Sequence, residues 1–395
     1  MYNNKIVYLC LGEMRIKMKD FSYFLSKNEK VIYELRALYE HHGYSKYKMQ
    51  KFEEYDLYAD NKSFLKSDNV ITFTDLSGKL MALKPDVTLS IAKNSLWKKE
   101  DFQKVYYTEN VYRGDKGAGE YKEIMQLGLE YIGSIDLFVL LEVLTLAAKS
   151  LESISEEYVM DISHMGFVAG LLESICERET VKESLLSAVS KKDYDSVMLI
   201  CNTNGISHEN AKKVAALTRI YGSFDECSEK LSKLIENEKM QRAYDELQEV
   251  FSALSKFAKG SKIKIDFSLI NDMNYYNGIT FSGFVPGVPC SILSGGRYDN
   301  LIAKMGKHQS AIGFAVYMDL LEIYDKSENY AETDILLMYT ENDDAVEVIT
   351  EAEKIIEKGY TVRTLKCKDN TVKYSRVLNF SKGIADTLEG GQKND

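Results

Sequence analysis

Residues 295–322 read GGRYDNLIAKMGKHQSAIGFAVYMDLLE, and this stretch guides the interpretation of the whole chain. A glycine pair and an Arg-Tyr-Asp triplet come just before a short glycine turn, and we expect the apolar segment that follows to be a helix. Such a stretch is typical of the floor of a small-molecule pocket. The expected helix, however, carries Asp319 and Leu320 where a site that handles nucleotides needs a cation. The sequence therefore predicts a pocket floor that lacks this charge.

The composition indicates a chain with room for two or three domains. It has 395 residues, of which 45% are hydrophobic, so it can bury more than one core. Its six cysteines form no C-x-x-C pair and lie near no set of histidines, which argues against a zinc site or a disulfide framework and favours a reducing cytoplasm. The five histidines lack the spacing of metal ligands. We therefore expect neither a metal nor another cofactor.

Charge and hydropathy argue against nucleic acid and membrane as partners. The formal net charge of -10 disfavours nonspecific binding to phosphate backbones. The most apolar stretch, residues 135–148, is interrupted by Asp136 and Glu142 and is too short to span a bilayer. The amino terminus lacks a signal-peptide cleavage pattern. We expect a soluble protein in the cytoplasm.

Hydrophobic periodicity predicts an α+β fold in which helices flank a central antiparallel sheet. Residues from about 165 to 260 are charged and helical, with no strand pattern, and this predicts an inserted helical layer. The order strand, helix, strand over 333–366 predicts a small α/β domain that begins after 326–332. Helices are otherwise predicted at 28–42, from about 86, and at 137–151, and strands or hairpins at 69–85, 102–134, 262–270, 275–285 and 290–299.

Several separated motifs, in this order, resemble those of the histidyl-tRNA synthetase family, including its paralogues, the regulatory subunits of ATP phosphoribosyltransferase. The motifs are LKPDVT (83–88), VYRGD (111–115), QLGLEYIG (126–133), NYYNGITF (274–281), GGRYDNL (295–301) and AIGFAVYMDLL (311–321). The resemblance implies a class II synthetase-like core over 1–330, with the helical insertion at about 165–260. It also implies that 331–395 form a small α/β domain similar to a shortened anticodon-binding domain.

The departures from the synthetase pattern concern charge. Arg113 matches the arginine of the second class motif, but Leu320 stands where the third motif has an arginine, and Asn271 stands where the histidine signature has one. Loss of one preorganised charge-stabilising donor typically costs about 3 to 4 kcal/mol of barrier. With both arginines absent, the resemblance implies negligible formation of an aminoacyl adenylate and a chain without a catalytic site of its own.

The resemblance also implies a retained histidine-like pocket. Asp86 and Thr88 are expected to meet an amino group, Gln126 to add a polar contact, and Glu130 with Tyr276 to recognise an imidazole. The full set implied for this pocket is Asp86, Thr88, Arg113, Gln126, Glu130, Asn271, Tyr275, Tyr276, Gly295 and Gly296.

Several of these residues also have a simpler structural interpretation. Asp86 is well placed to cap the helix after Pro85, and Tyr275 suits core packing. Arg113 has acidic neighbours with which it can pair on a solvated hairpin, and the glycine pair suits a bulge or a tight packing point. For Glu130 we favour a functional partner, because an unpaired carboxylate in an apolar strand is costly to bury.

The resemblance implies a noncatalytic regulatory subunit. It would form a homodimer within a hetero-octamer with the short-form ATP phosphoribosyltransferase catalytic subunit, activate the first step of histidine biosynthesis, and help to transmit feedback inhibition with histidine as effector. Two alternatives stay open. One is a divergent histidyl-tRNA synthetase in which Lys84 or Lys304 replaces the missing arginines, and the other is a stand-alone paralogue that binds an amino acid or RNA.

Overall fold

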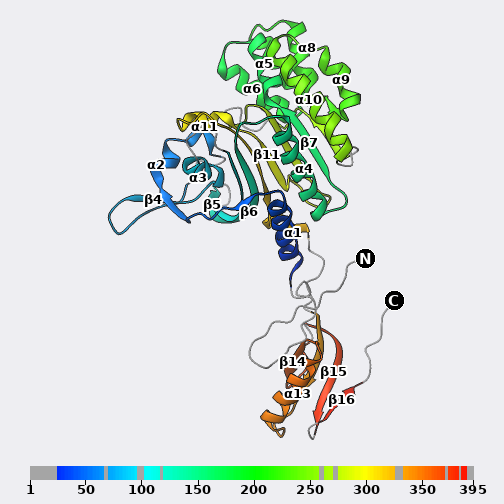
Figure 1. The fold of residues 1–395 in the computed structure, drawn as a ribbon. Coiled ribbons are helices and arrows are strands. Elements are labelled where there is room, and N and C mark those ends of the chain that lie inside the picture. Colours follow the sequence, from blue (N-terminus) through cyan, green and yellow to red (C-terminus); the bar gives the residue numbers. More distant parts are fainter. Residues whose placement is uncertain are drawn as a thin grey trace. The chain divides into compact units, whose positions relative to one another are not determined.

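The computed structural model describes residues 25–65, 70–95, 102–115, 119–257, 262–269, 275–324, 332–369, 372–381 and 384–388. Contacts divide the chain into a large unit, Val31–Tyr324, and a smaller one that contains Asp325–Asp395. The large unit carries the motifs of the sequence analysis, and Figure 1 shows the elements of both units.

A nine-stranded sheet forms the centre of the large unit, in the order β1-β5-β6-β12-β11-β10-β7-β9-β8. The predicted antiparallel sheet is confirmed from β5 through to β7, while β1 pairs with β5 and β9 pairs with β7 in parallel. In chain order the strands are β1 (Ser45–Lys46), β5 (Gln103–Asp115), β6 (Glu120–Gly133), β7 (Val159–His164), β8 (Tyr221–Gly222), β9 (Ile263–Asp266), β10 (Ile279–Phe284), β11 (Leu293–Arg297) and β12 (Ser310–Tyr317).

Strand β12 corrects the prediction of an apolar helix after the glycine turn. Residues 310–317 lie in the middle of the sheet between β6 and β11, and only the short helix α12 (Asp319–Tyr324) follows. A central strand is buried on both faces, so its residues are apolar without alternation, and hydrophobic periodicity cannot distinguish such a run from a buried helix.

Helices cover both faces of this sheet. Helices α1 (Lys27–His41) and α4 (Leu137–Ile154) contribute to the larger apolar cluster on one face. On the other face, α3 (Val87–Asn94) and α11 (Asp299–Lys304) contribute to a second cluster with residues of β5, β6 and β12. This second face carries the functional side chains described below.

The predicted helical layer connects β7 to β9 and is drawn in green in Figure 1. Its members are α5 (Met165–Ile175), α6 (Glu179–Ser190), α7 (Tyr194–Thr203), α8 (His208–Leu217), α9 (Phe224–Ser232) and α10 (Glu238–Phe257). The prediction of no strand in this layer is wrong for β8, a two-residue strand that pairs with β9. A strand of this length is too short to show alternation.

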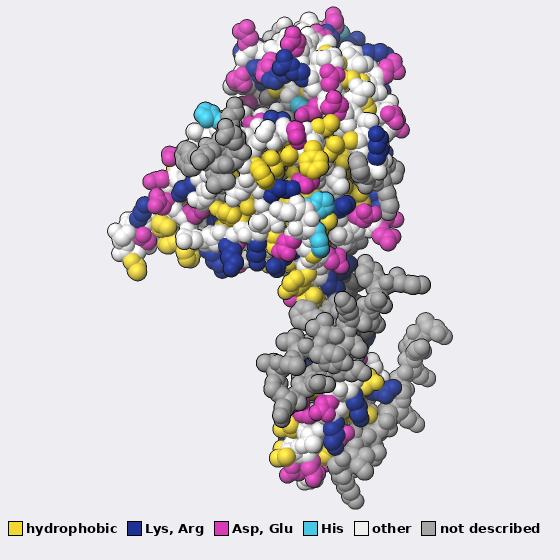
Figure 2. Space-filling model, in the orientation of Figure 1, with side chains coloured by type: hydrophobic (Ala, Val, Ile, Leu, Met, Phe, Trp, Pro, Cys, Tyr) yellow, Lys and Arg dark blue, Asp and Glu magenta, His cyan; other side chains and the backbone are white. Residues whose placement is uncertain are grey.

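A separate three-stranded sheet carries the predicted hairpin, in the order β2-β4-β3. It comprises β2 (Phe52–Glu54), β3 (Thr72–Thr74) and β4 (Leu80–Leu83), with helix α2 (Tyr55–Ala59) and the 3-10 turn Lys62–Phe64 beside it. Phe52 and Phe73 are exposed and meet edge to face, with their ring centroids 5.2 Å apart. Figure 2 shows hydrophobic side chains on the part of the surface formed by this hairpin.

The smaller unit contains a four-stranded sheet in the order β14-β13-β15-β16. Its first three elements, β13 (Glu332–Met338), α13 (Ala345–Glu357) and β14 (Val362–Leu365), are the strand, helix and strand that the sequence predicts, and β15 (Lys373–Ser381) and β16 (Ile384–Leu388) follow. Ile335, Val348 and Phe380 belong to a separate apolar cluster of this unit. Within the described ranges, no helix has the length and apolarity to cross a bilayer.

Candidate functional site

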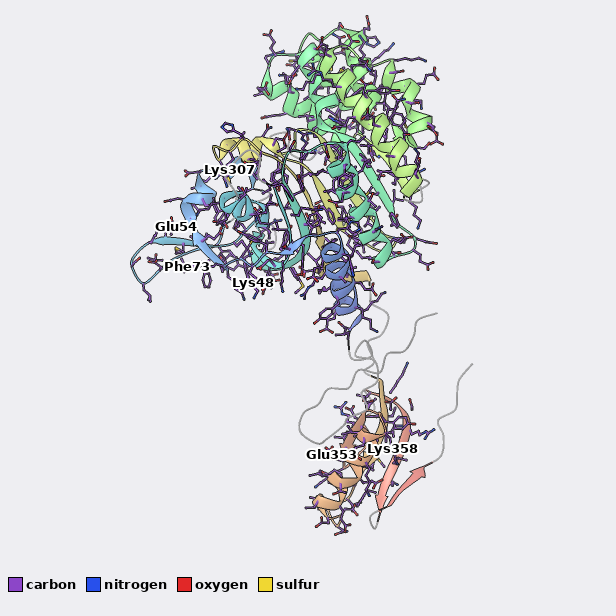
Figure 3. The ribbon with its side chains drawn as sticks, viewed as in Figure 1. Lys48, Glu54, Phe73, Lys307, Glu353 and Lys358 are labelled. Atoms are coloured by element: carbon purple, nitrogen blue, oxygen red, sulfur yellow. The ribbon has the colours of Figure 1, made fainter. Side chains whose placement is uncertain are left out.

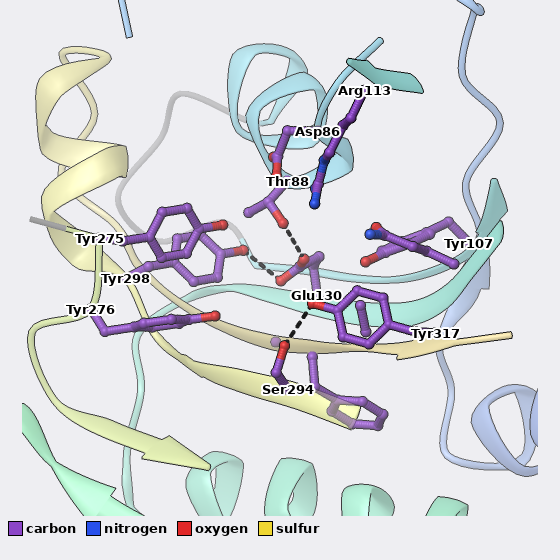
Figure 4. Close-up of a pocket in the computed structure, with 14 residues that line it drawn as sticks. Asp86, Thr88, Tyr107, Arg113, Glu130, Tyr275, Tyr276, Ser294, Tyr298 and Tyr317 are labelled. Atoms are coloured by element: carbon purple, nitrogen blue, oxygen red, sulfur yellow. Dashed lines mark hydrogen bonds between the residues drawn. The ribbon is translucent and has the colours of Figure 1, made fainter. Parts of the chain in front are cut away.

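A small cavity lies on the α3 and α11 face of the sheet and has a volume of about 30 Å³ (Figure 4). This volume has room for only one or two water molecules. Seven of the predicted residues line the cavity, namely Asp86, Thr88, Arg113, Gln126, Glu130, Tyr275 and Tyr276. Four segments distant in sequence therefore meet at one place.

The start of helix α3 positions three of these side chains. Asp86 is extended and caps the helix, because its Oδ1 accepts a hydrogen bond of 2.9 Å from the backbone N–H of Leu89. Thr88 follows in the first turn and turns its hydroxyl toward the cavity floor (Figure 4). The Nε of Arg113, on β5, donates a 3.0 Å hydrogen bond to the carbonyl oxygen of Pro85. The capping interpretation of Asp86 is confirmed, and the same cap holds the residue at the cavity.

Glu130 lies at the centre of the floor and is 2% exposed. Its Oε1 accepts a 2.8 Å hydrogen bond from the Thr88 hydroxyl, and its Oε2 accepts one of 2.7 Å from the Tyr298 hydroxyl. Gly313 stands opposite Glu130 on β12, and a Cβ atom there would lie 1.7 Å from Oε2. The carboxylate therefore fits only because residue 313 is a glycine, and the protein itself supplies partners for it.

Buried tyrosines form much of the remaining wall. The ring centroids of Tyr275 and Tyr276 are 4.6 Å apart, and those of Tyr275 and Tyr298 are 5.8 Å apart. Burial raises the pKa of the Tyr107, Tyr275, Tyr276 and Tyr298 hydroxyls well above the usual value, and the nearby Glu130 carboxylate raises it further. At neutral pH these hydroxyls are protonated and can donate hydrogen bonds.

Two further predicted residues, Gly295 and Gly296, do not line the cavity. A Cβ on Gly296 would lie 2.6 Å from the Tyr276 ring, so this glycine makes room for a lining side chain without lining the cavity itself. Gly295 points to the other face of the sheet, where a Cβ would lie 2.7 Å from the Phe281 ring. Both glycines are therefore tight packing points, as their simpler structural interpretation predicted. Asn271 lies outside the described residues.

Four polar lining residues were not predicted: Tyr107, Ser294, Tyr298 and Tyr317. Strand register supplies the signal that would have found two of them. Gly313 on β12 is opposite both Glu130 on β6 and Gly296 on β11. Ser294 lies an even number of residues from Gly296 along β11, and Tyr317 lies an even number from Gly313 along β12. Side chains at such spacings share a face of the sheet, so Ser294 and Tyr317 lie on the same face as Glu130. This reasoning requires that residues 310–317 form a strand. The sequence analysis predicted a helix there, so it could not identify Ser294 and Tyr317.

The cations proposed to replace missing arginines lie away from the cavity. Lys84 is 0% exposed, and its Nζ forms an ion pair of 2.9 Å with Glu109. The Nζ of Lys304 lies 5.1 Å from the centroid of the Phe64 ring. Leu320 packs against the larger apolar cluster. Among the described lining residues, Arg113 is the only one with a positive charge.

The arrangement suits a small zwitterion better than a polyanion. Asp86 and Glu130 can accept from an ammonium group or a ring N–H, and Arg113 can pair with one carboxylate. A triphosphate needs more positive charge than a single arginine provides. In the part of the chain that the structure describes, no three His, Cys, Asp or Glu side chains gather so that they could hold a metal ion.

Comparisons with known proteins agree on one family. The histidyl-tRNA synthetase family model matches residues 24–321. A relative from Ruminiclostridium cellulolyticum, named ATP phosphoribosyltransferase regulatory subunit, is 30% identical over 300 residues, which are 75% of this chain and 71% of the relative.

Two solved structures have a similar fold. An ATP phosphoribosyltransferase regulatory subunit/histidyl-tRNA synthetase from Bacillus halodurans is 24% identical with a TM-score of 0.73, over 94% of this chain and 98% of that one. A chain of the ATP phosphoribosyl transferase (HisG:HisZ) complex from Thermotoga maritima is 19% identical with a TM-score of 0.58, over 74% of this chain and 97% of that one.

Proposed function

The chain belongs to the histidyl-tRNA synthetase family and, within it, to the ATP phosphoribosyltransferase regulatory subunits, and from this membership we propose that it activates a short-form catalytic subunit without a catalytic site of its own. The name of the Ruminiclostridium relative and the complex from Thermotoga maritima support such a partnership. The partner would catalyse the first step of histidine biosynthesis in the cytoplasm.

The charge of the cavity is the observation that supports a noncatalytic role. A synthetase must stabilise negative charge as it develops on the phosphates of ATP, and it uses arginines for this purpose. Here Arg113 is the single cation among the described lining residues, and Leu320 is a partly buried residue that packs against the larger apolar cluster. Neither Lys84 nor Lys304 lines the cavity, so nothing favours the alternative of a divergent synthetase that uses these lysines.

Histidine is the effector that best fits the cavity. Its ammonium group would meet Asp86 and Thr88, its carboxylate would pair with Arg113, and its imidazole would contact Glu130 and Tyr276. Feedback then requires that histidine bind two states of the assembly unequally, typically by about 1 to 3 kcal/mol. We propose that a homodimer of the chain joins the catalytic subunit in a hetero-octamer.

The test is to mix the purified chain with the short-form catalytic subunit of the same organism. We expect light scattering to detect a larger complex with equal numbers of both chains, and we expect the turnover of the catalytic subunit to rise and then to fall when histidine is added. The complete histidyl-tRNA synthetase of the organism is the matched control, because it shares the core fold and should do neither. Separate elution with unchanged turnover contradicts the proposal, and so does aminoacylation of tRNA by the chain at an ordinary synthetase rate.

A further inference from the structure

One wall of the cavity is closed by a hydrogen bond between two side chains from neighbouring strands. The Ser294 hydroxyl, on β11, lies 2.8 Å from the Tyr317 hydroxyl, at the end of β12. In the sheet register Ser294 is opposite Ala315. Tyr317 lies two residues beyond Ala315 along β12 and therefore on the same face of the sheet. Figure 4 shows the two side chains meeting beside Glu130.

The cavity is too small for the proposed ligand. Its volume is about 30 Å³, whereas a cavity that accepts one benzene ring measures about 150 Å³. An imidazole ring with its amino-acid backbone needs at least as much space as benzene. The cavity must therefore widen before histidine can enter.

Tyr317 is the aromatic wall residue best able to move. Tyr107, Tyr275, Tyr276 and Tyr298 are all buried, whereas the Tyr317 side chain is half-buried and reaches solvent. Movement of a buried ring requires its packed neighbours to move as well. Rotation of Tyr317 toward solvent would uncover the small residues Ser294 and Ala315, which line the cavity with it.

We propose that the hydrogen bond between Ser294 and Tyr317 is a latch that holds the cavity closed, and that histidine binds only after Tyr317 has swung outward. The inference rests on the proposed binding of histidine in this cavity. A protein that populates its open state only in part binds with an affinity reduced by that fraction. Weakening the latch thus raises the apparent affinity for histidine.

Calorimetry with two conservative variants tests the latch. Tyr317→Phe keeps the ring and removes its hydroxyl, and Ser294→Ala removes the other partner. Each should raise the affinity for histidine about three- to tenfold, in line with the loss of one hydrogen bond. The double variant should gain no more than Tyr317→Phe, because that change already breaks the bond between the two side chains.

Tyr374→Phe is the matched control. Tyr374 lies in the smaller unit, on β15, and its buried hydroxyl has no hydrogen-bond partner among the residues that the structure describes. The affinity for histidine should stay unchanged in this variant. Unchanged affinity in Tyr317→Phe overturns the latch, and so does weaker binding, because Tyr317 would then bind the ligand directly.

A second measurement is independent of the ligand. Tetranitromethane nitrates accessible tyrosines, and mass spectrometry locates the modified residue. The Ser294→Ala variant should show severalfold faster nitration of Tyr317 than the wild type. Equal rates overturn the latch whether or not histidine binds. If Tyr317 is nitrated faster in Ser294→Ala but the protein binds no histidine, the latch is supported. The proposed function is then wrong in naming histidine as the ligand.

Discussion

At the scale of single residues, Glu130 combines a structural role with a proposed one. Its two oxygens accept hydrogen bonds from Thr88 and Tyr298, and these bonds keep a carboxylate that is 2% exposed from being unpaired. Each carboxylate oxygen has two lone pairs, so these two bonds do not by themselves prevent Glu130 from accepting a further bond from a ligand N–H. The two roles are therefore compatible.

Glu130→Gln separates these roles. The substitution keeps the size and removes the charge, so the affinity for histidine should fall by the roughly 1.5 to 3 kcal/mol typical of hydrogen bonds to charged groups. The melting temperature should fall as well, because the bonds from Thr88 and Tyr298 lose a charged acceptor. Calorimetry and thermal melting measure the two effects.

Tyr298→Phe is the control for stability alone. It removes one bond to Glu130 and leaves the negative charge in place, so melting should change more than histidine affinity. If both variants melt earlier and neither changes the affinity, Glu130 is purely structural.

At the scale of elements, helix α3 is fixed at both ends, which keeps Asp86 and Thr88 in position. Asp86 caps its first turn. At the other end, the Lys307 Nζ donates to the carbonyl oxygens of Ala92, Lys93 and Ser95 at 2.6, 3.1 and 2.8 Å. A cation at this end also opposes the negative pole of the helix dipole. Lys307, labelled in Figure 3, thus ties the loop before β12 to the helix that lines the cavity.

Lys307→Met should destabilise the fold by about 2 to 3 kcal/mol, because it leaves buried carbonyl groups without their donor. Lys307 is 3% exposed, and burial lowers the pKa of its ammonium group, yet its hydrogen bonds keep it in place. Urea unfolding measures the loss, and histidine affinity should fall with it because Asp86 and Thr88 lose their support.

Lys304→Met provides the comparison for this prediction. Lys304 is the neighbouring lysine and lies over the Phe64 ring, a contact worth about 0.5 to 1 kcal/mol at an exposed site. Equal losses in the two variants would contradict the role given to Lys307.

Elements also differ in how well the sequence predicts them. The hairpin of β3 and β4 and the paired strands β5 and β6 were predicted because polar and apolar residues alternate or a glycine turn separates the strands. Strand β12 was not, because its burial on both faces removes the alternation. The strand β7 was also missed, although Met160, Asp161, Ile162 and Ser163 alternate between apolar and polar, because so short a stretch gives only a weak signal.

At the scale of the whole molecule, the class II synthetase-like fold predicted from the resemblance is confirmed by the family model and the solved structures. Position in the motifs predicted the residues that line the cavity, such as Asp86 and Glu130. It did not predict that Glu130 has internal partners or that Tyr317 closes the wall. These are properties of side chains that meet across strands, and a linear motif does not contain them.

The large unit should fold without the smaller one. Both of its apolar clusters and its cavity consist of residues from Val31–Tyr324, so we expect a chain that ends after Tyr324 to unfold cooperatively and to bind histidine as the full chain does. Circular dichroism melting and calorimetry on both chains measure this. A truncated chain with no cooperative transition would show that the large unit depends on the smaller one.

The packing of Leu320 also limits how this scaffold can be engineered or can evolve. A nucleotide-activating enzyme would require an arginine at residue 320, but Leu320 belongs to the apolar packing of the larger cluster. Leu320 is partly buried, so Leu320→Arg would place a guanidinium group against the edge of that core and lower stability unless the group finds a partner or reaches solvent. A single exchange would therefore weaken the protein before it could supply any new chemistry. A stable enzyme on this scaffold would therefore need a partner for the new charge as well as the arginine itself.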